Sequence, residues 1–185
     1  MHRLHALSAA QKIPSGALRL PDPEFSPAFY GPYTAAIETT LREISAVREA
    51  HTVLRGEDCI RAITFRLKSP ASIRDKLRKK GLPASARIAS CALRDIAGLR
   101  VVLSDVDAVY SFASLLRESS ALCCFAEHDY IRWPKRSGYK SLHLLVQIAV
   151  SGVDSPVPAE IQLRTLQMDE WASIEHEIIY KPRRS

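Results

Sequence analysis

Apolar side chains recur along the chain at two spacings, and each spacing predicts a different element. Residues 32–54 have apolar positions three and four apart and stop at Gly56, which predicts a helix. The inward side chains of that helix would be Ala36, Ile37, Leu41, Ile44, Val47 and Val53. Residues 60–67 alternate, which predicts a strand with Ile63, Phe65 and Leu67 on one face and Thr64, Arg66 and Lys68 on the other.

The rest of the chain predicts helices and strands that intermix. A short basic helix opens at Ser69-Pro70 and ends before Gly81. Further helices are expected over 87–93, 105–119 and 165–180, and further strands over 99–103, 123–131, 142–150 and 157–163. The last two strands form a hairpin-like pair, so the pattern favours an α+β fold in which helices flank a mixed sheet.

Two of these helices have an apolar face that is expected to point inward. In the helix over 105–119 it consists of Val106, Val109, Phe112, Ala113 and Leu116. In the helix over 165–180 it consists of Met168, Trp171, Ile174 and Ile178. Both helices are therefore predicted to pack against the sheet.

The start of the chain differs from the remainder. Residues 1–27 contain four prolines and no sustained periodicity, which predicts a poorly ordered arm. The other residues, 28–185, are expected to form one domain, because a chain of 185 residues is the length of a single domain.

Composition places the chain among ordinary globular proteins. Hydrophobic residues make up 46% and charged residues 25% of the sequence, which excludes a disordered or fibrous protein. No apolar run approaches the roughly 20 residues of a membrane helix, and no secretory signal is visible, so a cytoplasmic location is expected. The cysteines Cys59, Cys91, Cys123 and Cys124 lack zinc-site spacing and are interpreted as reduced, mostly buried thiols.

Positive charge is concentrated in one segment. The chain has a formal net charge of +6, and residues 66–80 hold seven basic side chains against one acid, Asp75. These basic residues are Arg66, Lys68, Arg74, Lys76, Arg78, Lys79 and Lys80. Such a segment either binds polyanions or is a solvated helix face, and the charge pattern alone leaves both open.

Two stretches near this segment have side chains suited to phosphate and metal. Arg66 and Lys68 share a strand face and lead into Ser72 and Lys76, which share a helix face four residues apart. Cations beside a helix start suit a polyphosphate, although a solvated basic helix would read the same way. Asp95, at the mouth of an apolar strand, is a candidate ligand for Mg²⁺ or an ordinary turn aspartate.

Two later stretches place polar groups on or beside strands. The loop over 133–138 contains Lys135 and is followed by Tyr139 and His143. A purine nucleotide could stack on the tyrosine while Lys135 and His143 contact its phosphates. The alternative is an ordinary surface loop. On the strand over 157–163, Glu160 and Gln162 face the same side, and Arg164 continues that side. These three residues either pair structurally or line a site.

Taken together in order and spacing, these stretches resemble the synthetase domain of the RelA/SpoT family, which makes the alarmones ppGpp and pppGpp. The resemblance runs from about Arg66 to Lys181 and includes the closing run from Arg164 to His176. That ending is most similar to the small, single-domain alarmone synthetases. The resemblance implies the nucleotidyltransferase-like synthetase fold, without a hydrolase domain before it or a regulatory domain after it.

The resemblance also implies a reaction and a role for each residue. The family transfers the β,γ-pyrophosphate of ATP to the 3′-hydroxyl of GDP or GTP and uses Mg²⁺. Asp95 and Glu160 match its essential carboxylates, both expected near the metal, with Glu160 activating the hydroxyl. The donor contacts would be Arg66 and Arg100 around the adenine and Lys68, Ser72 and Lys76 at the phosphates. Tyr139 would stack the guanine, Lys135 and His143 would contact the acceptor nucleotide, and Gln162 and Arg164 would line the site.

Alternative functions and the oligomeric state stay open at this point. Relatives with the same fold pyrophosphorylate the 3′ end of tRNA, and a degenerate member would bind nucleotide or RNA without catalysis. Retention of both carboxylates together with Tyr139, Arg66 and Arg100 speaks against the degenerate reading. We expect no alarmone hydrolysis. Small synthetases that form tetramers continue into further helices, and this sequence ends four residues after Lys181, so the oligomeric state stays open.

Overall fold

Helices and strands follow one another as the hydrophobic pattern predicts. The computed structural model describes residue 22 and residues 24–180. The helices are α1 (Pro27–Arg55), α2 (Pro70–Lys79), α3 (Ala86–Ala92), α4 (Val106–Arg117) and α5 (Leu166–Tyr180). The strands are β1 (Ile60–Leu67), β2 (Ala97–Leu103), β3 (Cys123–Asp129), β4 (Leu142–Ile148) and β5 (Val157–Thr165).

The five strands form one mixed sheet in the order β1-β2-β5-β4-β3. Strands β2 and β5 run parallel, and the other neighbouring pairs are antiparallel. The predicted hairpin is the β4–β5 pair, so the predicted α+β fold with a mixed sheet is confirmed. Because β5 is the middle strand of the sheet, its side chains have a neighbouring strand on both sides.

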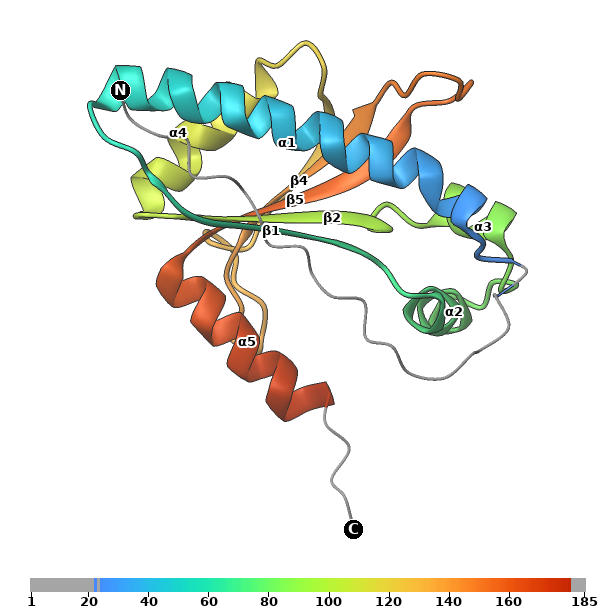
Figure 1. Cartoon of the computed structure of the whole chain (residues 1–185). Coiled ribbons are helices and arrows are strands. Elements are labelled where there is room, and N and C mark those ends of the chain that lie inside the picture. The colour runs from blue at the N-terminus through green and yellow to red at the C-terminus, as the bar shows by residue number, and fades with distance from the viewer. Residues whose placement is uncertain (1–21, 23, 181–185) are drawn as a thin grey trace, which may run out of the picture.

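Two helices cover one face of the sheet, and the other face is left for polar groups. Helices α1 and α4 lie across the first face, and α5 lies on the opposite side (Figure 1). On β2, Leu99, Val101 and Leu103 are buried in the core, whereas Arg100 between them is only half-buried. The strict alternation of a strand therefore divides the sheet into an apolar face and a polar face.

Helix α1 begins earlier than the apolar spacing predicts, and residues before it are packed. The helix starts at Pro27 and continues through Pro32, where the sequence pattern placed its start. Phe25 is buried and its ring lies 5.1 Å from that of Phe29. The prediction of a poorly ordered arm is therefore wrong for residues 24–27, because an aromatic cluster holds them on the domain. Asp22 of the same predicted arm pairs with Arg74 in α2, and the remainder, residues 1–21 and 23, lies outside the described residues.

Several side chains that were predicted to face inward are exposed. Val53 lies in the last turn of α1 and is 84% exposed, and Val106 begins α4 and is 39% exposed. In α5, Trp171 and Ile174 are about half exposed, because the described part of this helix packs on β5 and β2 along one side. The predicted inward side chain of Ile178 lies outside the described part of the chain.

Two further expectations are corrected by the position of each residue in the fold. Strand β1 is at the edge of the sheet, so Phe65 on its predicted apolar face is more than half exposed. All four cysteines are free thiols; Cys59 is buried, but Cys91 and Cys123 are exposed, against the expectation of mostly buried thiols. Over the described residues, none of the helices is long and apolar enough to cross a membrane.

Candidate active site

Polar side chains from four adjacent strands share the open face of the sheet. Strand register pairs Arg66 with Gly98, Gly98 with Glu160, and Gln162 with both Arg100 and His143. Residues that pair across strands point to the same face. The register therefore gathers Arg66, Arg100, His143, Glu160 and Gln162, which lie up to 96 residues apart in sequence order, on one surface.

Asp95 stands just before β2 and is held between two lysines. Its Oδ2 atom lies 3.1 Å from Nζ of Lys68, which follows β1, and 2.6 Å from Nζ of Lys76, in α2. The backbone N–H of Lys68 donates to the carbonyl of Ile96 at 2.8 Å, which fixes the two segments side by side. Two ammonium groups on one carboxylate leave this corner with a surplus positive charge, which suits a phosphate chain.

The second oxygen of Asp95 has the character of a metal ligand. Oδ1 is buried and accepts no hydrogen bond from any described residue. A buried carboxylate oxygen without a partner is costly, and a bound cation would satisfy it. Asp95 and Glu160 line the same pocket. Within the described residues, we find no group of three or more His, Cys, Asp or Glu side chains that could hold a metal. A pair of carboxylates that leaves room for phosphate oxygens fits Mg²⁺.

Glu160 lies in mid-strand on β5 with a donor at each oxygen. Nδ1 of His143 lies 3.0 Å from Oε1, and the amide of Gln162 donates to Oε2 at 2.6 Å. Burial alone would raise the pKa of Glu160. The hydrogen bond and electrostatic interaction with His143, the amide of Gln162 and the charge of Lys76 outweigh burial and lower this pKa to about 2. The carboxylate is therefore ionised at neutral pH.

Arg164 extends this network from the end of β5 to Tyr139. Its Nη2 donates to the hydroxyl of Tyr139 at 2.6 Å and to the amide oxygen of Gln162 at 2.7 Å, and its Nε donates to Ser141 at 3.4 Å. The Tyr139 hydroxyl lies 2.7 Å from Nε2 of His143. Because Arg164 is 3% exposed, these bonds hold its guanidinium inside the site rather than at the surface.

Tyr139 is less open than a stacking platform needs to be. Its side chain is buried, and the ammonium of Lys135 lies 4.5 Å from its ring centroid. The same ammonium lies 4.5 Å from the ring of Tyr130, so the lysine is held between two aromatic rings. A base that stacked on Tyr139 would have to take the place of Lys135 or move the loop.

The loop that precedes Tyr139 is fixed by a contact with α5. Gly138 has φ +83°, and a Cβ atom placed there would lie 3.3 Å from Cζ2 of Trp171. The backbone conformation therefore favours glycine, and a Cβ atom there would also crowd the indole ring. Trp171, half of whose surface is exposed, therefore lies against the loop that leads into Tyr139.

A carboxylate that the sequence reasoning missed joins two of the predicted residues. Oδ1 of Asp169, in the first turn of α5, lies 3.0 Å from Nη1 of Arg100 and 3.1 Å from Nη1 of Arg164. Asp169 lies within the closing run of the resemblance, five residues after Arg164, but that run assigned it no role. Helix-start acids are common, so its position alone did not point to the site.

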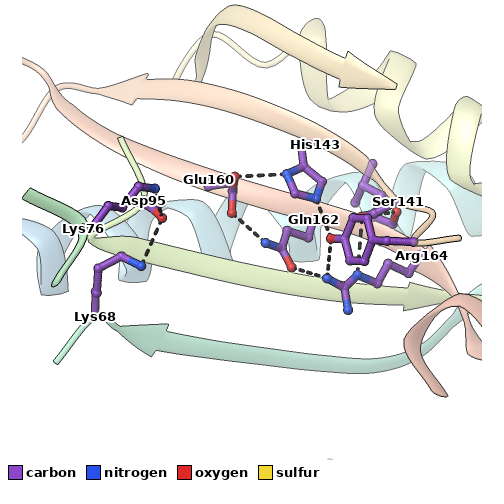
Figure 2. A network of polar contacts seen from close by, with 10 residues as sticks. Lys68, Lys76, Asp95, Ser141, His143, Glu160, Gln162 and Arg164 are labelled. Atoms are coloured by element: carbon purple, nitrogen blue, oxygen red, sulfur yellow. Dashed lines mark hydrogen bonds and ion pairs between the residues drawn. The ribbon is translucent and has the colours of Figure 1, made fainter. Parts of the chain in front are cut away.

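Most of the predicted site residues fall into two connected groups (Figure 2). Asp95 with Lys68 and Lys76 forms one group, and Glu160 with His143, Gln162 and Arg164 forms the other. The pocket between them, about 90 Å³ in volume, is also lined by Arg66 and Arg100. Lys135 reaches the second group only through its contact with the Tyr139 ring. Ser72 joins neither group, since its hydroxyl accepts from Ser69 at the start of α2.

The comparisons with known proteins agree on one family. The sequence of residues 65–185 matches the region found in RelA / SpoT proteins. The chain is 34% identical over 151 residues to the GTP pyrophosphokinase YwaC of Bacillus subtilis. This alignment covers 80% of the present chain and 72% of YwaC. The match to this family spans more than half of the sequence, so the chain belongs to the RelA/SpoT family.

Solved structures show the same fold. Small alarmone synthetase 1 from Bacillus subtilis bound to its product pppGpp superposes with a TM-score of 0.73 and 34% identity, over 83% of this chain and 78% of that one. The same relative bound to AMPCPP gives a TM-score of 0.66 and 29% identity, over 83% and 76% of the chains. The expected RelA/SpoT synthetase fold is therefore confirmed.

Proposed function

We propose that this chain is a small alarmone synthetase that transfers the β,γ-pyrophosphate of ATP to the 3′-hydroxyl of GDP or GTP, releasing AMP. The observation that carries the proposal is the arrangement of Asp95, held by Lys68 and Lys76, and Glu160 around one pocket on the open sheet face. Relatives named GTP pyrophosphokinase, and a related structure that holds pppGpp, support the same substrates.

The donor half of the proposed site is the positive corner around Asp95. The ATP phosphates would lie against Lys68 and Lys76, which already converge on one carboxylate oxygen. Arg66 and Arg100 line the adjoining pocket and are placed to contact the adenine with their planar guanidinium groups. The pocket is far smaller than the roughly 300 Å³ or more of typical ligand sites, so the nucleotide would lie largely across the open face.

Asp95 and Glu160 would hold Mg²⁺ in this site. The metal would offset the charge that develops on the transferred phosphate oxygens. The unpartnered Oδ1 of Asp95 supports its assignment as a ligand.

In the reaction the 3′-oxygen of the acceptor attacks the β-phosphorus of ATP. The bond between that phosphorus and the α,β-bridging oxygen breaks, so AMP leaves with this oxygen. Glu160 would accept the proton of the 3′-hydroxyl. At a pKa of about 2 the carboxylate is ionised but weakly basic. An acceptor hydroxyl that displaced His143 from Oε1 would remove the strongest interaction that lowers this pKa, and Glu160 would become a better base.

The surplus cations of α2 give little support to a tRNA acceptor. Arg74 pairs with Asp22, and Arg78 and Lys79 both pair with Asp75. Part of the charge that made the segment over 66–80 appear suited to nucleic acid is therefore offset locally. A nucleotide acceptor remains the better proposal.

A labelling experiment tests the acceptor directly. The protein is incubated with Mg²⁺ and ATP labelled at the γ-phosphate, with GDP, GTP or bulk tRNA offered in parallel. Label in a guanosine nucleotide is the expected result. Label in tRNA alone would replace this proposal by the tRNA alternative, and no labelled product with any acceptor would leave only a non-catalytic nucleotide-binding role.

A further inference from the structure

Asp169 occupies a position between the two halves of the site. It lies in the first turn of α5, immediately after β5 ends, and its side chain is 22% exposed. A single oxygen, Oδ1, is within ion-pair distance of both Arg100 on β2 and Arg164 on β5. One carboxylate oxygen therefore connects two neighbouring strands of the sheet.

Each of the two arginines leads to a different half. Arg100 lines the pocket beside Arg66 and Asp95, where the donor is proposed to bind. Arg164 holds the hydroxyl of Tyr139 and the amide of Gln162, and through them it reaches the acceptor half. Asp169 is thus the contact through which a displacement of one guanidinium would reach the other.

Electrostatics makes this connection strong. The side chains of Arg100 and Arg164 are 34% and 4% exposed, so their like charges are poorly screened from each other. Burial lowers the pKa of Arg100, the charge of Arg164 lowers it further, and Asp169 acts in the opposite direction. Without the carboxylate, the two guanidinium groups would repel each other and move apart.

Arg100 also has unused bonding capacity. Its Nε is buried and donates to no described residue. A ligand that shifted the side chain enough to reach Nε would add a contact there while Nη1 keeps Asp169. Ordering of one group before a second ligand binds produces positive coupling between the two ligands.

We propose that Asp169 is a positioning residue that couples the binding of the donor and acceptor nucleotides. This inference rests on the proposed function, because it takes the pocket by Arg100 as the donor half and Tyr139 as part of the acceptor half. Donor contact would fix Arg100 against Asp169, and Asp169 would thereby keep Arg164 and Tyr139 in the positions that they already hold and that the acceptor needs. By reciprocity, acceptor binding strengthens donor binding by the same factor.

The test is a binding measurement without turnover. The dissociation constant of α,β-methylene ATP, whose carbon bridge blocks transfer, is measured by calorimetry with Mg²⁺, with and without saturating GDP. The ratio of the two constants is the coupling. We expect wild type to show a ratio of about fivefold or more, Asp169→Asn a ratio near one, and Asp169→Glu an intermediate ratio. Glu170→Gln, an exposed neighbour on the same helix, is expected to keep the wild-type ratio.

The possible outcomes separate this proposal from its alternatives. The proposal is overturned if the ratio is one in wild type, or if Asp169→Asn has the same ratio as wild type. It is also overturned if Asp169→Asn binds both ligands more weakly while its ratio is unchanged. If Asp169→Asn does not fold by circular dichroism, Asp169→Glu decides, and a wild-type ratio in that variant overturns the proposal. If wild type shows the coupling but transfers nothing to GDP or GTP, the proposed function fails while the role of Asp169 stands.

Discussion

Nδ1 of His143 lies 3.0 Å from Oε1 of Glu160, so a predicted acceptor contact and the predicted base are hydrogen-bonded to each other. The bond joins β4 to β5 on the open face of the sheet. It lowers the pKa of Glu160 and occupies Oε1, the oxygen that a 3′-hydroxyl would approach in the proposed mechanism. In the proposed mechanism, acceptor binding and activation of Glu160 would be linked through this contact.

Removing the carboxylate of Glu160 is expected to stop transfer while donor binding survives. Glu160→Gln keeps the shape of the side chain, but an amide cannot accept the hydroxyl proton. We expect the rate of transfer to fall by about 10²–10⁴-fold. Calorimetry with α,β-methylene ATP should still show binding, because Lys68 and Lys76 remain.

The matched control is Glu127→Gln, which removes a carboxylate from the Arg117 ion pair on β3. This variant should transfer at the wild-type rate. Normal turnover by Glu160→Gln would show that the base lies elsewhere.

Removing the imidazole of His143 is expected to change the pH dependence of the reaction. His143→Ala abolishes the strongest interaction that lowers the pKa of Glu160, so that pKa rises from about 2. The acid limb of kcat/KM should move to higher pH. His128→Ala, which alters the exposed histidine paired with His143 across β3 and β4, should leave the limb unchanged. If the acid limb of kcat/KM were the same in His143→Ala as in wild type, His143 would not control the pKa of Glu160.

Glu160 should also make the stability of the free protein depend on pH. Its pKa is about 2 in the folded state against 4.5 for the unperturbed group, so its contribution is complete above about pH 4.5 and is lost as the pH falls toward 2. The full loss corresponds to about 3 kcal/mol. Measured by urea unfolding, the free energy of unfolding should therefore decline less steeply from pH 5 to pH 3 in Glu160→Gln than in wild type. Equal declines in the two proteins would argue against the low pKa.

Tyr139 should contribute to acceptor binding through its ring. Tyr139→Leu is expected to raise the KM for GDP by about 5–150-fold, the range for a lost base–aromatic stack, while the KM for ATP changes little. Tyr139→Phe keeps the ring and loses the bonds to Arg164 and His143, so its defect should be smaller. Equal defects in both variants would assign the effect to the hydroxyl rather than to stacking.

Gly138 should be required for the loop contact with α5. Gly138→Ala must place a Cβ atom at φ +83° and 3.3 Å from Trp171. Gly152→Ala is the matched control, since φ there is +76° with nothing within 4 Å. Backbone strain should lower the free energy of unfolding of both variants by about 1–2 kcal/mol. Measured by urea unfolding, Gly138→Ala should lose at least about 1 kcal/mol more than Gly152→Ala. Equal costs would show that the indole ring yields easily.

Periodicity was sufficient to predict the elements and the mixed sheet, because alternation and helical spacing are local properties of the sequence. It failed where packing between distant segments decides the outcome. The burial of Phe25 depends on Phe29, and the exposure of Val53 depends on where α1 leaves the sheet. No local pattern contains this information.

The candidate site shows the same division. Glu160 and Gln162 could be placed on one face from strand alternation, and the resemblance assigned their roles. The bond between Lys76 and Asp95, and the double contact of Asp169, could not be predicted, because they depend on the positions of α2 and α5 against the sheet. A short-range pattern does not specify how helices dock.

The nature of the leaving nucleotide tests the central claim most directly. Purified protein is incubated with Mg²⁺, ATP and GDP, and the products are resolved by anion-exchange chromatography and mass spectrometry. Pyrophosphate transfer predicts AMP in amounts equal to a guanosine nucleotide that has gained two phosphates on its 3′-oxygen. Release of ADP, or ATP consumption with unchanged GDP, would contradict the account.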